Sequence, residues 1–412
     1  MDTETSPEQH DPSDEYDKER DERARVQLRV IQESLEDVGV ALPKGSDDPA
    51  DWLYLYRRSR ILVRDADLPR VLDALEGRGE VDSALVNGVT RVVVQTDEEL
   101  PAVLADLDRR LGPGVATPDH VLYVTAKGTC CPATEPLEPP GTAPLPAVNT
   151  VTTDGAGVFV SVVDTGWYAD AATSPLTPWL AGVTGDPEVI DPANIHPYGG
   201  HGTFIAGAVR CQAPSAEVRV EGFLPKGGAV YESDIVVQLC EALALGPDII
   251  SLSAGARTRG DRPLVGFEVF WSNFLSQVSG TVLVAAAGND STRAPFWPAA
   301  FPWTIGVGAI DAAGNRSSYS NFGSWVDVYA LGDDQVNAFP VGDYVAHEPP
   351  FVGQQRSFKG LAQWSGTSFA TPVVAGMIAA RMSRSGLSAR LAADELLAEA
   401  RANAIRGVGP VL

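Results

Sequence analysis

The sequence predicts an α/β protein in which a mostly parallel sheet carries helices on both faces, preceded by a small N-terminal α/β domain. Short, almost wholly apolar runs recur from residue 149 onward, as expected of parallel strands that are buried on both faces. Segments of helical length separate these runs, and such a strand–helix–strand order builds a parallel sheet. The 412 residues, 44% of them hydrophobic, suffice for one large core and a smaller one.

Composition divides the chain into four parts. Residues 1–24 are dense in charge, which predicts a disordered acidic tail and no secretion signal. Residues 25–130 alternate helix-like and strand-like pieces and predict a small α/β domain. Residues 131–148 contain six prolines and are expected to form an extended linker. Residues 149–412 hold the large sheet.

Apolar spacing places the individual elements. In the small domain the expected helices are 26–38, 68–75 and 100–111, and the expected strands are 60–63, 90–94 and 120–125. In the large domain the expected strands are 158–163, 218–220, 249–252, 282–287 and 304–307, with helices at 204–209, 233–245, 267–278 and 370–383. The small domain thus reads as β-α-β-α-β, and the large domain as a repeated strand–helix unit.

Charge and cysteine content exclude several classes of function. The formal net charge is −23, which argues against nucleic acid or an anionic membrane as a partner, because both need basic patches. The four cysteines, Cys130, Cys131, Cys211 and Cys240, match no zinc-site spacing, and the adjacent pair is unsuited to a mutual disulfide. These features predict a reducing, cytoplasmic setting without a metal or other cofactor.

A serine at the start of a predicted helix is the first candidate for chemistry. Ser368 follows a flexible Gly366-Thr367 pair, and Pro372 in the first helical turn is tolerated there. The hydroxyl and the backbone amide of Ser368 therefore lie at a helix N-terminus, where partial positive charge favours a developing anion. A lone serine at this place is more often only a helix cap.

Three further residues follow predicted strands or glycine-rich turns. Asp164 ends the first buried strand, although Asp-Thr-Gly is also a common turn. His201 stands in Gly-Gly-His-Gly-Thr, where glycines expose the imidazole, although most histidines are structural. Asn289 follows another buried strand, where a turn asparagine is the ordinary interpretation and an oxyanion donor the functional one.

Taken together, these residues resemble the subtilisin-like serine proteases. The order of the motif residues is that of the family, and it runs Asp164, His201, Asn289, Ser368. The resemblance implies a subtilisin-like fold over residues 149–383, with Ser368 as nucleophile, His201 as general base and Asp164 orienting the imidazole. Asn289 would help to bind the oxyanion, a contribution of roughly 3–4 kcal/mol.

By the same resemblance, Ser251, Leu252 and Ser253 are expected to bind a protein or peptide substrate as an added strand. Phe204 and Phe369 replace a usual histidine and methionine and are expected to be packing changes. The stretch after Gly207 lacks the insertion that builds a calcium loop in secreted relatives, so no calcium site is expected there. Residues 333–361 form a longer connection than usual, either a surface loop or a segment that shapes access for the substrate.

Two questions stay open at this level. The N-terminal domain is either a cleaved, propeptide-like domain, with its processing site within residues 131–148, or a permanent regulatory domain. The chain as a whole is interpreted as a serine endopeptidase that works through an acyl-enzyme, and the alternative is a catalytically silent scaffold that binds a partner.

Overall fold

The computed structural model describes residues 12–124, 135–141, 146–224 and 227–412. Its helices are α1 (Pro12–Ser34), α2 (Leu68–Ala74), α3 (Leu100–Leu111), α4 (His201–Gln212), α5 (Glu232–Ala244), α6 (Val265–Asn273), α7 (Thr367–Ser385) and α8 (Ala389–Ala402). The strands of the N-terminal part are β1 (Val38–Ala41), β2 (Tyr54–Arg64), β3 (Gly79–Val86), β4 (Val89–Val94) and β5 (Ala116–Tyr123). Those of the large domain are β6 (Phe159–Asp164), β7 (Thr184–Gly185), β8 (Glu217–Gly222), β9 (Ala229–Tyr231), β10 (Ile249–Leu252), β11 (Val282–Ala286), β12 (Thr304–Ile310), β13 (Val328–Leu331), β14 (Gln335–Val345) and β15 (Gln355–Trp364).

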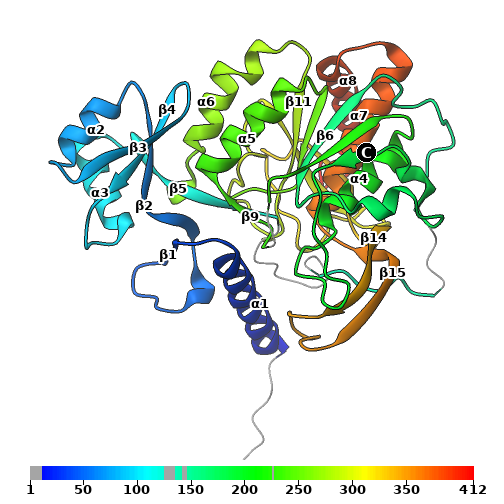
Figure 1. Ribbon diagram of the computed structural model, residues 1–412, viewed down its shortest axis with the longest axis horizontal. Helices are drawn as coiled ribbons and strands as arrows, with labels where there is room; N and C mark the ends of the chain where they lie inside the picture. The colour runs from blue at the N-terminus through cyan, green and yellow to red at the C-terminus, as the bar shows by residue number, and fades with distance from the viewer. Residues whose placement is uncertain (1–11, 125–134, 142–145, 225–226) are drawn as a thin grey trace, which may run out of the picture.

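The large domain is built on a seven-stranded parallel sheet in the order β13-β12-β11-β10-β6-β8-β7. Every residue of the central strands β10, β11 and β12 is buried, which explains why their sequences are continuous apolar runs. Helices α4 and α7 pack together against one face, and α5 and α6 lie on the other, toward the N-terminal domain (Figure 1). The predicted α/β fold with helices on both faces is confirmed.

The N-terminal domain shares a sheet with the large domain. Its strands follow the order β3-β4-β2-β5, with β1 beside β2, and β9 of the large domain continues the sheet by pairing antiparallel with β5. The predicted β-α-β-α-β order was wrong in two places, because neither β1 nor β3 had been expected. The strand β3 is largely exposed and offers little apolar signal.

Residues 12–24 are helical, so the expectation of a disordered tail over residues 1–24 was wrong for that part; residues 1–11 lie outside the described residues. The helix α1 begins at Pro12 and ends at Ser34, earlier than the predicted 26–38. Glutamate, lysine and arginine form helices readily. The buried face of α1, which includes Ala24, Leu28 and Ile31, is covered by side chains from distant parts of the chain, so the sequence of the helix alone does not reveal it.

Helix α1 lies along the large domain rather than away from it (Figure 1). Arg23 donates a hydrogen bond to the carbonyl oxygen of Pro349, and Tyr198 donates one to the side chain of Gln27. A Cβ atom added to Gly227 would lie 2.3 Å from the Cβ of Ser34, so the end of α1 touches the backbone just before β9.

The long connection before Ser368 is an antiparallel hairpin, β14–β15, and not a surface loop. Its inner face buries Phe339, Phe358 and Trp364. Leu137, within the segment predicted as a linker, pairs with Gln363 on the outer edge of β15. The helix α8, which had not been predicted, packs on α7 near the C-terminus.

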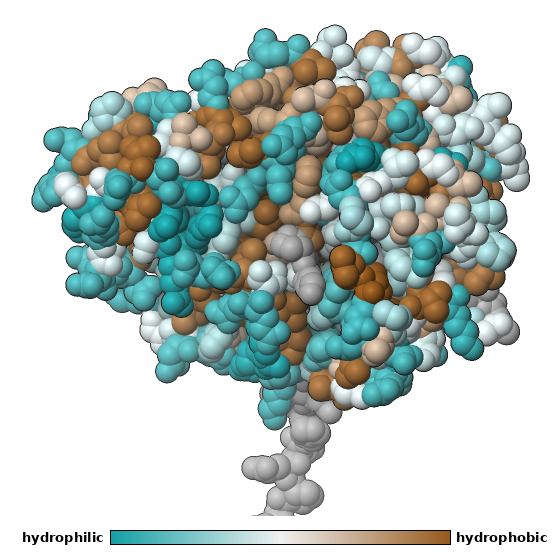
Figure 2. Space-filling view, viewed as in Figure 1, coloured by the Kyte–Doolittle hydropathy of each residue, from teal (hydrophilic) through white to brown (hydrophobic). Residues whose placement is uncertain are grey.

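Hydrophilic and hydrophobic residues are intermixed over the face seen in Figure 2. Among the described residues, no helix has both the length and the apolar character that crossing a bilayer requires.

Candidate active site

Three neighbouring strands deliver polar side chains to one edge of the large sheet. Asp164 is the last residue of β6, Ser253 directly follows β10, and Asn289 comes three residues after the end of β11. Because β11, β10 and β6 are adjacent and parallel, their carboxyl ends meet at one edge. The four candidate residues of the motif therefore converge once α4 and α7 place His201 and Ser368 at the same edge.

Asp164 and His201 form a fully buried pair. The Nδ1 of His201 lies 2.7 Å from the Oδ1 of Asp164, and that oxygen also accepts a hydrogen bond of 2.8 Å from the amide of Thr165. Both side chains are completely inaccessible. Gly200 begins α4 in the left-handed region (φ 79°), and a Cβ atom on Gly202 would lie 2.5 Å from the carbonyl oxygen of Gly166. The glycines therefore let the helix start close to the strand that carries the aspartate.

Ser368 is the second residue of α7, and its hydroxyl is engaged by other parts of the chain. The Oγ lies 3.2 Å from the carbonyl oxygen of Val124 and 3.4 Å from that of Ser253. The Nε2 of His201 is buried and has no hydrogen-bond partner among the described residues. The hydrogen bond between Ser368 and His201 is therefore not formed in this structure.

The side-chain carbonyl oxygen of Asn289 is fixed by hydrogen bonds. Its Oδ1 accepts hydrogen bonds from the backbone amide of Thr367, at 3.0 Å, and from the Thr367 hydroxyl, at 2.9 Å. The Nδ2 of Asn289 is buried and makes no hydrogen bond within the described part of the chain. A fixed amide with an unused donor beside the start of α7 is what an oxyanion requires.

The end of the N-terminal domain occupies this edge as an extended strand. Leu122 pairs with Val230 in β9, and Tyr123 exchanges two hydrogen bonds, of 2.9 and 3.1 Å, with Gly255. The amide of Val124 then donates to the carbonyl oxygen of Gly228 at 2.8 Å. Residues 122–124 thus lie between β9 and the segment that follows β10.

The prediction that residues 251–253 pair with the substrate was wrong for Ser251 and Leu252. Ser251 and Leu252 pair with β6 on one side and β11 on the other, so their backbone groups are used inside the sheet. Of the predicted stretch, Ser253 contacts Ser368, and the residue that pairs with the extended segment is Gly255. No motif in the sequence marked this glycine.

Aromatic side chains enclose the imidazole. The rings of Trp364 and Phe369 lie 5.3 and 5.2 Å from that of His201, and Phe204 lies 4.7 Å from Phe369. Phe204 and Phe369 are therefore packing residues, as predicted. Trp364 belongs to β15, so the hairpin inserted before Ser368 forms part of the wall around the histidine.

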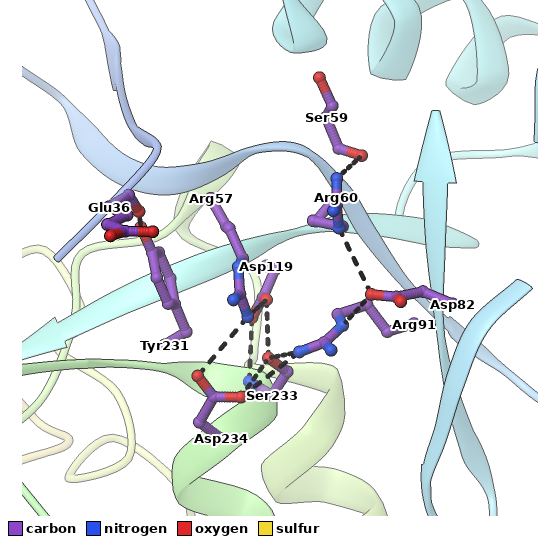
Figure 3. Close-up of polar contacts among 10 residues, drawn as sticks. All are labelled: Glu36, Arg57, Ser59, Arg60, Asp82, Arg91, Asp119, Tyr231, Ser233 and Asp234. Atoms are coloured by element: carbon purple, nitrogen blue, oxygen red, sulfur yellow. Dashed lines mark hydrogen bonds and ion pairs between the residues drawn. The ribbon is translucent and has the colours of Figure 1, made fainter. Parts of the chain in front are cut away.

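The N-terminal domain rests on the first turn of α5 through polar contacts (Figure 3). Asp119 accepts hydrogen bonds from the amide and the hydroxyl of Ser233, at 2.9 and 2.7 Å, and so caps the helix. Arg57 and Arg91 lie 3.5 and 3.3 Å from the carboxylate of Asp234. Burial raises the pKa of Asp119 to about 7, against the hydrogen bonds from Ser233.

The neighbouring contact fixes a neutral histidine. Beside this cap, His120 contacts the buried Glu232 at 3.2 Å through Nδ1 and accepts a hydrogen bond from the amide of Arg259 through Nε2. Burial lowers the pKa of His120 to about 3, in agreement with an Nε2 that accepts. No sequence motif marked these residues, because the contact joins two domains.

A buried carboxyl group supports the turn before His201. Glu188 accepts a hydrogen bond of 3.0 Å from the amide of Gly200, and its other oxygen lies 3.8 Å from the Nε2 of His196. Burial raises the pKa of Glu188 to about 8 and the charge of Asp164 adds to this, against hydrogen bonds from Gly200 and Thr165. Nothing in the sequence singled out this residue.

We expect Glu188→Gln to stabilise the protein at alkaline pH. A carboxyl group whose pKa is raised on folding binds its proton more tightly in the folded state, so its contribution is greatest below pH 4.5 and falls as the pH rises to about 8. Glutamine keeps the acceptor for Gly200 and has no charge to bury. The measurement is thermal unfolding, with Ser368→Ala present in both chains. At pH 9 the glutamine variant should unfold at a higher temperature, equivalent to up to a few kcal/mol of unfolding free energy. At pH 5 the two chains should differ little.

The matched control is Glu217→Gln, on an exposed carboxylate of β8. Equal midpoints for the Glu188 variant and its parent across pH 5–9 would show that the carboxyl group titrates normally.

Comparison with known proteins places this site in a family. The model of the subtilase family matches residues 155–404. The chain is 30% identical over 214 residues to the thermophilic serine proteinase of Bacillus sp. (strain AK1), covering 50% of this chain and 48% of that protein. It is 31% identical over 248 residues to thermitase of Thermoactinomyces vulgaris, covering 57% of this chain and 78% of thermitase.

The fold extends the likeness beyond the matched region. The crystal structure of fervidolysin from Fervidobacterium pennivorans superposes with a TM-score of 0.58 at 16% identity, over 90% of this chain and 61% of fervidolysin. The chain spans about half the length of the first of these relatives and 78% of thermitase. Because the family model covers well over half of the residues, the chain belongs to the subtilase family of subtilisin-like serine proteases.

Proposed function

We propose that the protein is a serine endopeptidase in which Ser368, His201 and Asp164 act as nucleophile, general base and orienting carboxylate. The observation that carries the proposal is the buried pair of Asp164 and His201 at 2.7 Å, next to a serine hydroxyl that already contacts a peptide carbonyl. Ser368 attacks the carbonyl carbon of the substrate and its proton passes to His201, which returns it to the leaving amine. Water then hydrolyses the acyl-enzyme by the same route.

The oxyanion has two donors in this proposal, the side-chain Nδ2 of Asn289 and the backbone amide of Ser368. The first is buried and unused in the described part of the chain, and the second lies in the first turn of α7, where amides lack helical acceptors. Substrate peptides are bound as an extended strand between β9 and Gly255, in the place that residues 122–124 occupy.

We also propose that the N-terminal domain is an inhibitor that the enzyme cuts from itself. The hydroxyl of Ser368 bonds to the carbonyl oxygen of Val124 instead of to His201, so in this state the serine is not activated as a nucleophile. The carbonyl of Val124 is not itself the one to be attacked, since the Nδ2 of Asn289 does not bind its oxygen. We therefore place the bond to be cut one residue later, between Thr125 and Ala126, which lie outside the described residues.

The alternative of a processing site within residues 131–148 is less well supported. In the described part of that segment, Leu137 pairs with Gln363, and Arg356 binds the carbonyl oxygen of Pro136 at 2.7 Å. Glu135 accepts a hydrogen bond of 2.8 Å from the Tyr344 hydroxyl. These contacts hold the segment on the β14–β15 hairpin.

We also propose a cytoplasmic location, in line with the free thiols of Cys211 and Cys240.

Intact-mass spectra after treatment with a fluorophosphonate test the proposal. The unchanged chain should lose residues 1–125 and gain one adduct, and Ser368→Ala should stay at full length without an adduct. A chain that gains neither a cut nor an adduct on long incubation at pH 7–9 would contradict the proposal and favour a silent scaffold. A cut elsewhere would leave the triad in place but refute the assignment of the cleaved bond.

A further inference from the structure

The side chain of Tyr123 occupies a site that the catalytic residues do not explain. Its two backbone hydrogen bonds to Gly255 fix its place in the strand, and the side chain is completely buried. Neighbouring residues 122 and 124 join the core of the large domain, whereas Tyr123 faces the other way, into a separate cluster of buried side chains. The tyrosine is therefore held by its own set of contacts.

Phe296 supplies the wall of this site from the large domain. Its ring lies 5.8 Å from that of Tyr123, at an interplanar angle of 62°, an edge-to-face arrangement that aromatic pairs favour. The backbone next to Phe296 is held within the large domain. The next residue, Trp297, exchanges two backbone hydrogen bonds with Ala256, and a Cβ atom on Gly255 would lie 2.4 Å from the Phe296 ring.

The phenol group also has a polar partner in the large domain. The amide of Arg257 donates a hydrogen bond of 3.4 Å to the Tyr123 hydroxyl. The carboxylate of Asp290 lies close enough to raise the pKa of Tyr123, although burial raises it more. The large domain thus meets both the ring and the hydroxyl, and Trp52 of the N-terminal domain completes the enclosure at 5.5 Å.

We propose that Phe296 and the amide of Arg257 form a binding site for an aromatic side chain, preferably tyrosine, at the residue of the substrate that pairs with Gly255. The inference rests on the proposed endopeptidase function. With the cut placed after Thr125, this residue is the third before the cleaved bond. The enzyme therefore selects proteins and peptides with an aromatic residue three places before the bond that it cuts, in addition to any preference at the cleaved bond itself.

Four fluorogenic peptides test this selection. Each has the sequence Leu-Xaa-Val-Thr joined to a fluorogenic amine, copied from residues 122–125, with Xaa as tyrosine, phenylalanine, leucine or alanine. They are given to the chain after expression at full length and self-processing. We expect kcat/KM for tyrosine to exceed that for alanine by about tenfold, and that for phenylalanine to lie within about threefold of tyrosine, because the hydrogen bond from Arg257 is long.

Two variants assign the selection to the site. Phe296→Ala should bring the four peptides to within about twofold of one another. The matched control is Phe351→Ala, on an exposed phenylalanine in the turn of the hairpin, which should leave the tenfold ratio unchanged. A preference for tyrosine that survives in Phe296→Ala would refute the assignment.

Digestion of denatured casein separates this inference from the proposed function. A processed chain that digests casein but cleaves the four peptides equally, or cleaves none of them, would overturn the aromatic site and leave the endopeptidase intact. A chain that digests neither would count against the endopeptidase itself. Because the comparison of peptides is made on the unchanged chain, it holds even where Phe296→Ala fails to fold.

Discussion

His201→Ala is expected to lower kcat for peptide hydrolysis by roughly 10⁶-fold, the size of loss that removal of the histidine causes in subtilisin. The reason lies in the surroundings of Ser368. Among the described residues, only backbone carbonyl oxygens lie within hydrogen-bonding distance of the hydroxyl, so without the imidazole no described group beside it accepts the proton. The variant also keeps residues 122–124 between β9 and Gly255, because a chain without the base cannot remove its own N-terminal domain.

The measurement is steady-state hydrolysis of the tyrosine peptide. Thermal unfolding checks that the variant is folded. His347→Ala, in the turn of the β14–β15 hairpin, is the control and should keep its activity. A His201→Ala chain that retains more than about one part in a thousand of kcat would point to another base and would refute the assigned role. Some loss of stability is expected, because Asp164 then remains buried without its partner.

Asp164→Asn is expected to lower kcat by about 10⁴-fold. The Oδ1 of Asp164 accepts from both His201 and the amide of Thr165, so an asparagine fits in the same volume. It has no charge to stabilise the imidazolium, and a flipped amide would donate to Nδ1 and fix the wrong tautomer. Geometry is preserved while the chemistry is lost.

The effect of Asp164→Asn is measured by the rate of fluorophosphonate labelling as well as by kcat, since both report on the activated serine. Asp170→Asn, an exposed residue of the same loop, should match the unchanged chain. Labelling of Asp164→Asn at the normal rate would show that the aspartate only holds the fold. A smaller loss than for His201→Ala is part of the prediction.

The sequence predicted best what one continuous segment decides. The strand 249–252 and the helix 100–111 have the predicted bounds, because each carries a complete apolar pattern of its own. The motif residues likewise come together at one edge of the sheet, since each lies at or shortly after the end of a buried strand, or in the first turn of a helix. Local backbone chemistry, with glycines around His201 and before Ser368, leaves few alternatives.

What depends on two distant segments could not be predicted in this way. The strand β9 has three residues and exists through its pairing with β5, more than a hundred residues earlier. The role of Gly255 appears only when Tyr123 lies beside it. The apolar face of α1 is short and interrupted by charge, and it acquires a meaning from the residues that cover it.

Helix α1 has a consequence for the lifetime of the inhibited state. The N-terminal domain is attached by the strand in the cleft, by the polar contacts with α5, and by α1, which contacts Pro349 at one end and Gly227 at the other. When one attachment opens, the others keep the domain at a high effective concentration, so dissociation requires all of them to open together. We therefore expect residues 12–34 to determine how long the cleaved N-terminal domain stays bound, and so the delay between self-cleavage and the first turnover of another substrate. This delay is independent of the catalytic residues.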